Sequence, residues 1–292
     1  MLSGVALGID IGGTGVKAAL VDVATGGLVT DRIREKTPQP STPDAVVATV
    51  RSVVGRVTAQ RTMPDGAPVG CGLPGVIKYG RLKTAANIDP SWIDVSAEEL
   101  LSERLGRPVL AINDADAAGL CEMTYGAGRG VDGTVLILTL GTGIGSALFI
   151  DGRLVPNTEF GHVEFKGKDA ETRLSGTARE RRGLGWKGWA KEFNAYLARL
   201  ELYFSPDLII LGGGVSKEFA RFDGLLKSNA PRVPAQFLNA AGIIGAAFAA
   251  ASALGHDGAD AGPEELPVPE LPASTAGTAP APRDVPTHAE SG

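Results

Sequence analysis

A pattern of apolar run, glycine-rich turn and second apolar run occurs twice in the chain. In the first half, Val5 to Ile11 and Val16 to Val23 flank the glycines at 12–15. In the second half, Thr134 to Leu140 and Ser146 to Ile150 flank the loop GTGIG. Apolar runs of this length beside glycine predict β-strands joined by tight turns. The repetition therefore points to two related lobes.

The remaining segments predict alternating strands and helices, because short apolar runs favour strands and apolar residues at helical spacing favour helices. Strands are expected at Leu28 to Arg34, Val69 to Leu73, Val109 to Ile112 and Asp207 to Leu211. Helices are expected at Pro43 to Val57, Asp114 to Tyr125, Trp186 to Phe204 and Ala241 to Leu254. We therefore predict an N-terminal α/β lobe over residues 1–125 and a C-terminal α/β lobe over residues 126–254.

The composition changes from residue 255 onward. Residues 255–292 hold seven prolines and no Phe, Trp or Tyr, so they bury too little apolar surface to offset the entropy of ordering. They carry seven acids against one base, and this leaves the first 254 residues nearly neutral although the whole chain has a net charge of −5. We expect a disordered, acidic tail rich in Pro and Ala.

Composition also excludes several classes of protein. Hydrophobic residues make up 43% of the chain and charged residues 21%, which is ordinary for a soluble globular protein. There is neither an apolar run long enough for a membrane helix nor a signal-peptide pattern, so we expect a cytoplasmic protein that binds no membrane. Cys71 and Cys121 are too few for a disulfide framework, and we expect both in the core.

Three glycine-rich loops each directly follow an apolar strand: DIGGTG at 10–15, LGTGIG at 140–145 and LGGGV at 211–215. One such loop is more often a plain hairpin, but three at strand ends favour phosphate binding, because glycine lets backbone N–H groups approach phosphate oxygens closely. The loops lack the spacing of a P-loop or a dinucleotide-binding fingerprint. The candidate phosphate-binding residues are Gly12, Gly13, Thr14, Gly15, Lys17, Gly141, Thr142, Gly143, Gly213 and Gly214.

An acid in the first loop is a candidate metal ligand. Asp10 could hold a hydrated Mg²⁺, since Mg²⁺ keeps several waters and needs only one or two carboxylates beside substrate phosphates. The alternative is an acid that only ends a strand.

Polar residues suited to sugar hydroxyls occur in two segments. AANID supplies Asn87, with Trp92 shortly after it, and NTEFGHVE supplies Glu159 and His162, with Glu171 beyond. Amides, carboxylates and an imidazole can hydrogen-bond the hydroxyls of a hexose and reject analogues that lack them. Taken alone, His162 would more often be a structural histidine.

The stretch NDADAAG follows the strand expected at Val109 to Ile112. Asn113, Asp114 and Asp116 suit a helix start, where acids interact favourably with the helix dipole. On the residues alone, a helix cap and a catalytic carboxylate both stay open.

Together, the motifs of this chain resemble the ROK sugar kinase family. They are GIDIGGTGVK, NDADAAG, TLGTGIGSAL, PNTEFGH with KDAETR and TARER, SPDLIILGGGVSK and AGIIGAA. The resemblance runs from about residue 6 to residue 250, and the GVK at 15–17 and the DAETR segment are closer to the branch of polyphosphate glucokinases than to ordinary ROK glucokinases. It implies a two-lobed, actin-like (ribonuclease H-like) α/β fold, with the sugar between the lobes and usually a homodimer.

The resemblance also implies an activity and roles for residues. A polyphosphate-glucose phosphotransferase would phosphorylate the 6-hydroxyl of glucose with inorganic polyphosphate, ATP or both, together with Mg²⁺. Asp114 would be the general base, and Asn87, Asn113, Glu159, His162 and Glu171 would hold the sugar hydroxyls. An Asp with its reference pKa near 3.9 is a weak base, so it would act late in the transfer. Asp116 is expected to be only a helix-start acid.

The sequence departs from the ROK family pattern at the position of a zinc site. Many ROK proteins carry a cysteine cluster just after the Gly-His pair, whereas this chain reads VEFKGKDAETR there. We therefore expect no zinc, and the residues that hold Glu171 in place stay open.

Three alternatives compete with this interpretation. One is a strictly ATP-dependent ROK glucokinase or glucomannokinase. Another is a sugar-sensing ROK regulator, but the first strand begins so close to Met1 that we expect no room for a helix-turn-helix and no nucleic-acid partner. The last is a non-catalytic actin-like assembly protein, in which Asp114 and the sugar-type residues would have no purpose.

A basic segment at 166–191 is a candidate surface for a polyanion. It holds eight bases against three acids. A polyphosphate chain could cross it, with an affinity that falls as salt rises. The alternative is an ordinary solvated helix face, because Trp186 and Trp189 indicate packing on one side.

Overall fold

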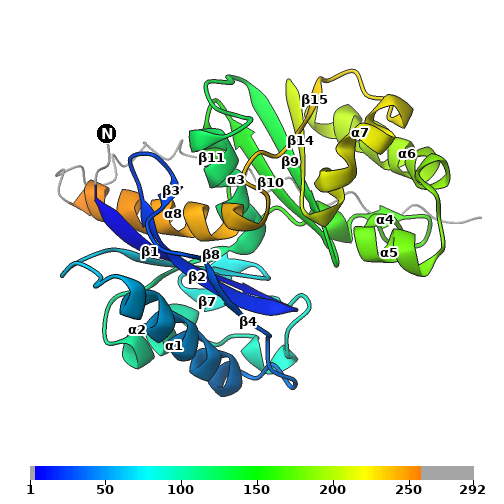
Figure 1. Cartoon of the computed structure of the whole chain (residues 1–292). Coiled ribbons are helices and arrows are strands. Elements are labelled where there is room, and N and C mark those ends of the chain that lie inside the picture. Colours follow the sequence, from blue (N-terminus) through cyan, green and yellow to red (C-terminus); the bar gives the residue numbers. More distant parts are fainter. Residues whose placement is uncertain (1–3, 258–292) are drawn as a thin grey trace, which may run out of the picture. The chain divides into compact units, whose positions relative to one another are not determined.

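The structure is a computed structural model that describes residues 4–257, with side chains as far as residue 254. Its first sheet has six strands in the order β3-β2-β1-β5-β8, and β4 also pairs with β2 (Figure 1). β1 is antiparallel to β2 and parallel to β5, which is parallel to β8. The strands are β1 (Val5–Gly12), β2 (Gly15–Asp22), β3 (Gly27–Leu28), β4 (Ile33–Glu35), β5 (Val69–Leu73) and β8 (Leu110–Asn113).

The second sheet repeats this arrangement. Its order is β11-β10-β9-β14-β15, with β9 antiparallel to β10 and parallel to β14, which is parallel to β15. β9 and β10 thus correspond to β1 and β2, so the repeated strand-turn-strand pattern of the sequence is confirmed. The strands are β9 (Thr134–Leu140), β10 (Ile144–Ile150), β11 (Arg153–Val155), β14 (Leu208–Gly212) and β15 (Arg232–Pro234).

Helices cover both faces of the first sheet (Figure 1). α1 (Pro43–Gln60) and α2 (Ala97–Leu105) share one buried core with the sheet, and α8 (Ala241–Asp257) and α3 (Asp114–Tyr125) share another. The second sheet packs on α6 (Trp186–Phe204) and on the short helices α4 (Glu171–Leu174) and α7 (Phe219–Phe222), and α5 (Gly176–Arg181) follows α4. Two small hairpins complete the elements: β6 (Ile77–Lys78) with β7 (Arg81–Leu82), and β12 (Glu164–Phe165) with β13 (Lys168–Asp169).

α8 lies directly on the backbone of its neighbours. A Cβ atom at Gly8 of β1 or at Gly70 of β5 would collide with a carbonyl oxygen of α8, that of Ile243 or of Ala246. A Cβ atom at Gly245 of α8 would collide with the carbonyl oxygen of Ala117 in α3. Glycine is therefore needed at these crossings, and the small residues of α8 place the last helix on the first sheet.

Several boundaries differ from those expected from the sequence; for example, α1 ends at Gln60 instead of Val57 and β10 begins at Ile144 instead of Ser146. The single strand expected at Leu28 to Arg34 is wrong, because β3 and β4 are separate strands on β2. Between them the hydroxyl of Thr30 accepts the N–H of Leu20, a bond that a regular ladder would give to a carbonyl. α8 continues beyond Leu254 to Asp257, and the rest of the expected tail lies outside the described residues.

The division into lobes at residue 126 stays a prediction. α8 belongs to the C-terminal lobe in that division, yet it packs on β1 and β5 of the first sheet.

Candidate active site

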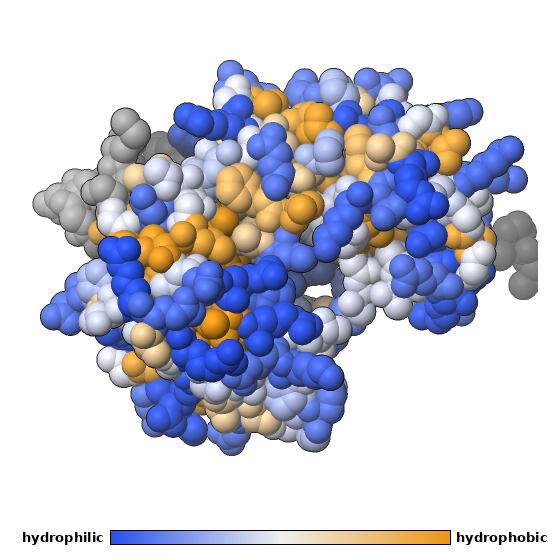
Figure 2. Space-filling model, in the orientation of Figure 1, coloured by the Kyte–Doolittle hydropathy of each residue, from blue (hydrophilic) through white to orange (hydrophobic). Residues whose placement is uncertain are grey.

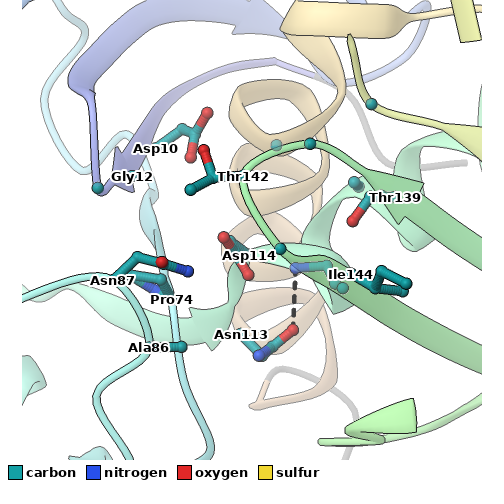
Figure 3. Close-up of a pocket in the computed structure, with 18 of the residues that line it drawn as sticks. Asp10, Gly12, Pro74, Ala86, Asn87, Asn113, Asp114, Thr139, Thr142 and Ile144 are labelled. Atoms are coloured by element: carbon teal, nitrogen blue, oxygen red, sulfur yellow. Dashed lines mark hydrogen bonds between the residues drawn. The ribbon is translucent and has the colours of Figure 1, made fainter. Parts of the chain in front are cut away.

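A cavity of about 280 Å³ lies where β1, β8, β9 and β14 end. It is lined by every sequence-predicted site residue except Gly15 and Gly214. Gly15 faces Gly12 in the β1–β2 hairpin, and Gly214 begins the turn after β14. Figure 3 shows Asp10, Asn87, Asp114 and Thr142 facing the same space from different elements.

The junction between β8 and α3 answers whether NDADAAG caps a helix or carries chemistry. The Oδ1 atom of Asn113 accepts the N–H groups of Ala115 and Asp116 at 2.9 and 3.0 Å, and one bond to Asn113 is dashed in Figure 3. Its Nδ2 atom donates to the carbonyl of Gly75 at 3.0 Å and to Glu159 at 3.4 Å. Asn113 is therefore the cap, and it could bind a sugar hydroxyl only by giving up one of these partners.

Asp114 is left free to face the cavity. No other side chain among those described hydrogen-bonds its carboxyl, which accepts a bond only from the backbone N–H of Ala115. Burial, with a further contribution from the negative charge of Asp10, raises the pKa of Asp114 to about 7. The expectation of a weak base with an ordinary pKa is therefore wrong, because the sequence did not reveal how deeply this carboxyl is desolvated.

Asp10 and Lys17 form an ion pair at the phosphate-type side of the cavity. The Lys17 Nζ atom lies 2.6 Å from Asp10 Oδ2, since the two residues are directly opposed in the β1–β2 ladder. Asp10 is only 8% exposed. The cavity thus holds a cation and an anion side by side, which suits a ligand that carries both phosphate oxygens and a metal ion.

The glycine loops pack tightly on each other and on their neighbours. A Cβ atom at Gly13 would lie 2.6 Å from the carbonyl oxygen of Asn87, which itself has a φ of 62°. Gly213 has a φ of 76°, and its Cβ atom would lie 2.6 Å from the amide nitrogen of Leu140. Glycine is needed at these positions because the loops lie against the backbone of neighbouring segments, whatever ligand they bind.

Three sugar-type residues line the cavity near one another: Glu159 and His162 are in contact, and the charge of Glu171 acts on both. The Nδ1 atom of His162 lies 2.8 Å from Asp169, and its Nε2 atom lies 3.7 Å from Glu159. The hydrogen bond with Asp169 raises the pKa of His162, whereas burial raises that of Glu159. Glu171 accepts the backbone N–H of Ile144 at 3.1 Å, and this contact holds it in place.

Two residues are more deeply buried than the sequence suggested. Trp92 is fully buried in the core beside α1 and donates its Nε1–H to the carbonyl of Ser41, so it does not reach the cavity. Asp116 is in the first turn of α3, as expected, but it is only 1% exposed. Its Oδ2 atom accepts the N–H of Asn157 at 2.7 Å, its Oδ1 atom has no partner within the described part of the chain, and burial raises its pKa to about 7.

Sequence reasoning missed several residues that line the cavity: Pro74, Gly75, Thr139, Ser146, Asn239 and Gly242. Gly242 lies where a Cβ atom would be 3.1 Å from the Asp10 carboxyl carbon, so the first turn of α8 reaches the ion pair. The only sequence signal for the position of Gly242 was the small-residue run AAGIIGAA, which is equally typical of a helix that packs closely on its neighbours.

Half of the basic segment at 166–191 is already paired within the molecule. Lys166, Arg173 and Arg182 surround Glu192, and Arg179 lies 4.0 Å from the centre of the Trp186 ring. Lys168, Arg181, Lys187 and Lys191 are exposed. Packing on Trp186 and Trp189 thus accounts for part of the segment, as the alternative interpretation expected.

Both cysteines are buried, as expected, and they do not form a disulfide. Within residues 4–257, none of the helices has the length and apolar character that crossing a membrane requires.

Comparison with known proteins supports the resemblance to the ROK family that the motifs indicated. Residues 6–179 match the ROK family. The chain is 45% identical over 250 residues to a polyphosphate glucokinase of Mycobacterium tuberculosis, which covers 85% of this chain and 92% of that protein.

Two crystal structures are similar to this one. The inorganic polyphosphate/ATP-glucomannokinase of Arthrobacter sp. strain KM superposes with a TM-score of 0.83 at 50% identity, covering 86% of this chain and 99% of that one. A ROK family glucokinase from Streptomyces griseus, in complex with glucose and AMPPNP, superposes with a TM-score of 0.74 at 26% identity, covering 85% and 100%. The α/β sugar kinase fold expected from the sequence is therefore confirmed.

Proposed function

Because the chain belongs to the ROK family, we propose that it is a sugar kinase that converts glucose to glucose 6-phosphate with inorganic polyphosphate, ATP or both as donor. The observation that carries this proposal is the position of Asp114. Its carboxyl, which no other described side chain bonds, lies between the Asp10–Lys17 pair with the glycine loops and the group formed by Glu159, His162 and Glu171. A base between a phosphate site and a hydroxyl site is what phosphoryl transfer to a sugar requires.

In the proposed reaction, the ionised Asp114 accepts the proton of the glucose 6-hydroxyl. The hydroxyl oxygen forms a bond to the terminal phosphorus of the donor as the bond from that phosphorus to the bridging oxygen breaks. The leaving group is a polyphosphate shortened by one unit, or ADP. A carboxyl with a pKa of about 7 is a stronger base than an ordinary Asp, and about half of it is ionised at neutral pH.

The donor would lie against the three glycine loops. Their backbone N–H groups and the Lys17 ammonium would hold its phosphate oxygens, with Thr14 and Thr142 beside them. Asp10 fits a hydrated Mg²⁺, since one buried carboxylate beside substrate phosphates is enough for this ion. When bound, Mg²⁺ would offset negative charge on the transferred phosphoryl group.

On the sugar side, Asn87, Glu159, His162 and Glu171 would hydrogen-bond the hydroxyls, and Asn113 would position Glu159 and the start of α3. The names of the similar proteins support polyphosphate and ATP as donors and glucose as acceptor. The glucomannokinase among them also supports mannose as a second acceptor.

We further propose a cytoplasmic homodimer, as the family resemblance implies. A sugar-sensing regulator or an assembly protein would share the fold but would not turn over glucose.

The test is to measure initial rates of glucose 6-phosphate formation with polyphosphate or ATP at equal Mg²⁺. Turnover with polyphosphate supports the full proposal, whereas turnover with ATP alone supports the strictly ATP-dependent alternative. No turnover with either donor would contradict a kinase function.

A further inference from the structure

One base lies in the short strand β4 and two more lie directly before and after it. Arg32, Arg34 and Lys36 alternate with Ile33 and Glu35, and the three bases are exposed whereas the two residues between them are half-buried. Side chains two residues apart on an extended segment lie on the same face, about 7 Å from one another. We call these three residues the β4 basic row.

The strand pairing joins this row to the cavity. Arg34 is directly opposed to Lys17 in the β2–β4 ladder, and Lys17 is directly opposed to Asp10 in the β1–β2 ladder. Directly opposed residues place their side chains on the same face of a sheet. Asp10, Lys17 and Arg34 therefore lie side by side across three strands, from the buried end of the cavity to the protein surface.

Two bases of the β4 basic row, Arg34 and Arg32, also contact residues that line the cavity. The Nη2 atom of Arg34 donates to the carbonyl of Thr14 at 2.8 Å, so its guanidinium lies on the first glycine loop. The Nη1 atom of Arg32 donates to the carbonyl of Asn239 at 3.1 Å. The row thus lies at the rim of the proposed donor site rather than on a distant surface.

The positive charge of the row is not neutralised. None of its three bases forms an ion pair with a carboxylate among the residues whose side chains the structure describes. Glu35, which lies between them in sequence, bonds to Ser52 and Arg56 of α1. The basic segment at 166–191 is different, because three of its bases surround Glu192. Figure 2 shows hydrophilic surface over the region that Figure 1 labels β2 and β4.

We propose that the β4 basic row binds the part of an inorganic polyphosphate chain that extends out of the cavity beyond the transferred phosphate. This inference rests on the proposed use of polyphosphate as donor. A polymer with a charge on every unit can contact Lys17, Arg34 and the two outer bases in succession, whereas ATP ends in a nucleoside after three phosphates. Each contact displaces counterions from the polymer, so binding should weaken steeply with salt.

Lys36 gives the sharpest test, because no hydrogen bond or ion pair ties its side chain to the rest of the described structure. The variant Lys36→Glu is compared with Arg51→Glu, which reverses an exposed base on α1 that forms no ion pair with the side chains described. Direct binding of long-chain polyphosphate is measured without glucose at several salt concentrations, and KM is measured for long-chain polyphosphate and for ATP.

We expect Lys36→Glu to weaken polyphosphate binding about five- to tenfold, to flatten the salt dependence, and to raise KM for polyphosphate several-fold more than KM for ATP. Arg51→Glu should change none of these. Arg34→Gln should act in the same direction as Lys36→Glu.

Four results would overturn the inference. Equal polyphosphate binding by Lys36→Glu and Arg51→Glu would remove the row from the binding path. Equal loss with ATP and polyphosphate would mean that the substitution disturbs the cavity itself. Polyphosphate turnover that stays normal in Lys36→Glu and Arg34→Gln refutes the row but leaves the proposed function intact, whereas a wild-type protein that uses only ATP refutes the polyphosphate donor and the row together.

Discussion

The ammonium of Lys17 and the carboxylate of Asp10 lie 2.6 Å apart at directly opposed positions of β1 and β2. The pair is mostly buried, so each charge depends on the other. A phosphate that enters the cavity would meet a cation already held in position, and the proposed metal ligand would sit beside it.

Replacing Lys17 with Met should leave Asp10 as an unpaired, buried carboxylate. We predict a loss of about 1–3 kcal/mol in the free energy of unfolding, together with a rise in KM for the donor. Denaturant unfolding and initial rates measure the two effects. The double variant Asp10→Asn, Lys17→Met should recover part of the stability but none of the donor affinity, and a double variant less stable than either single one would contradict this account.

Because α8 and α3 cross closely, we predict that adding one methyl group at the crossing strongly lowers the free energy of unfolding. Gly245→Ala places a methyl group against the carbonyl of Ala117, and neither helix backbone can move away cheaply. We expect a loss of about 3 kcal/mol or more in the free energy of unfolding.

Gly55→Ala is the matched control for that substitution. Gly55 is an exposed residue of α1, and a Cβ atom there would meet nothing within 4 Å. Because alanine is the better helix former, this variant should gain about 0.5–1 kcal/mol. Equal effects of the two substitutions would show that α8 does not rest on the backbone of α3.

The buried Asp116 predicts a stability that depends on pH. Its pKa is raised to about 7 in the folded protein, above the value of 3.8 for a free carboxyl, so folding favours the protonated form. This contribution is fully present below about pH 4 and is lost as pH rises through 7. Asp116→Asn, which can still accept the N–H of Asn157, should therefore gain about 2 kcal/mol relative to wild type between pH 5 and pH 8.

Urea unfolding at both pH values measures this difference. Asp65→Asn changes an exposed carboxyl and serves as the control. A difference between Asp116→Asn and wild type that stays constant with pH would mean that Asp116 keeps an ordinary pKa.

The repeated strands and the part of the cavity lining that the glycine loops supply could be predicted from the sequence, because both follow from local patterns. Glycine after an apolar run marks a strand end, and the ends of the neighbouring strands β9 and β14 bring Thr142 and Gly213 to the same cavity. What depends on distant parts of the chain could not be predicted. The hydroxyl of Thr30 splits one expected strand into two, and the pairing of β4 with β2 brings Arg34 onto the first glycine loop.

The pKa of Asp114 likewise could not be predicted from the sequence. Its position after β8 is visible in the sequence, but its raised pKa comes from burial and from the charge of Asp10, which is far away in sequence. The role of Asn113 as the cap likewise needed the partners of its side chain, Gly75 among them.

That raised pKa predicts a pH profile for the reaction. Asp114 must be ionised to accept a proton, so kcat/KM for glucose should rise with pH up to about 7 and then level off. Below that value it should fall about tenfold per pH unit. A profile that stays flat down to pH 5 would indicate that Asp114 titrates as an ordinary carboxyl or is not the base.

The most direct test of the proposed mechanism is the turnover number of Asp114→Asn with glucose and polyphosphate, beside that of the wild type. The amide keeps the size of the side chain but cannot accept the proton, so we predict that kcat falls by about 10² to 10⁴ while KM for glucose changes little. An Asp114→Asn variant whose kcat stays within about threefold of wild type would contradict the assignment of Asp114 as the catalytic base.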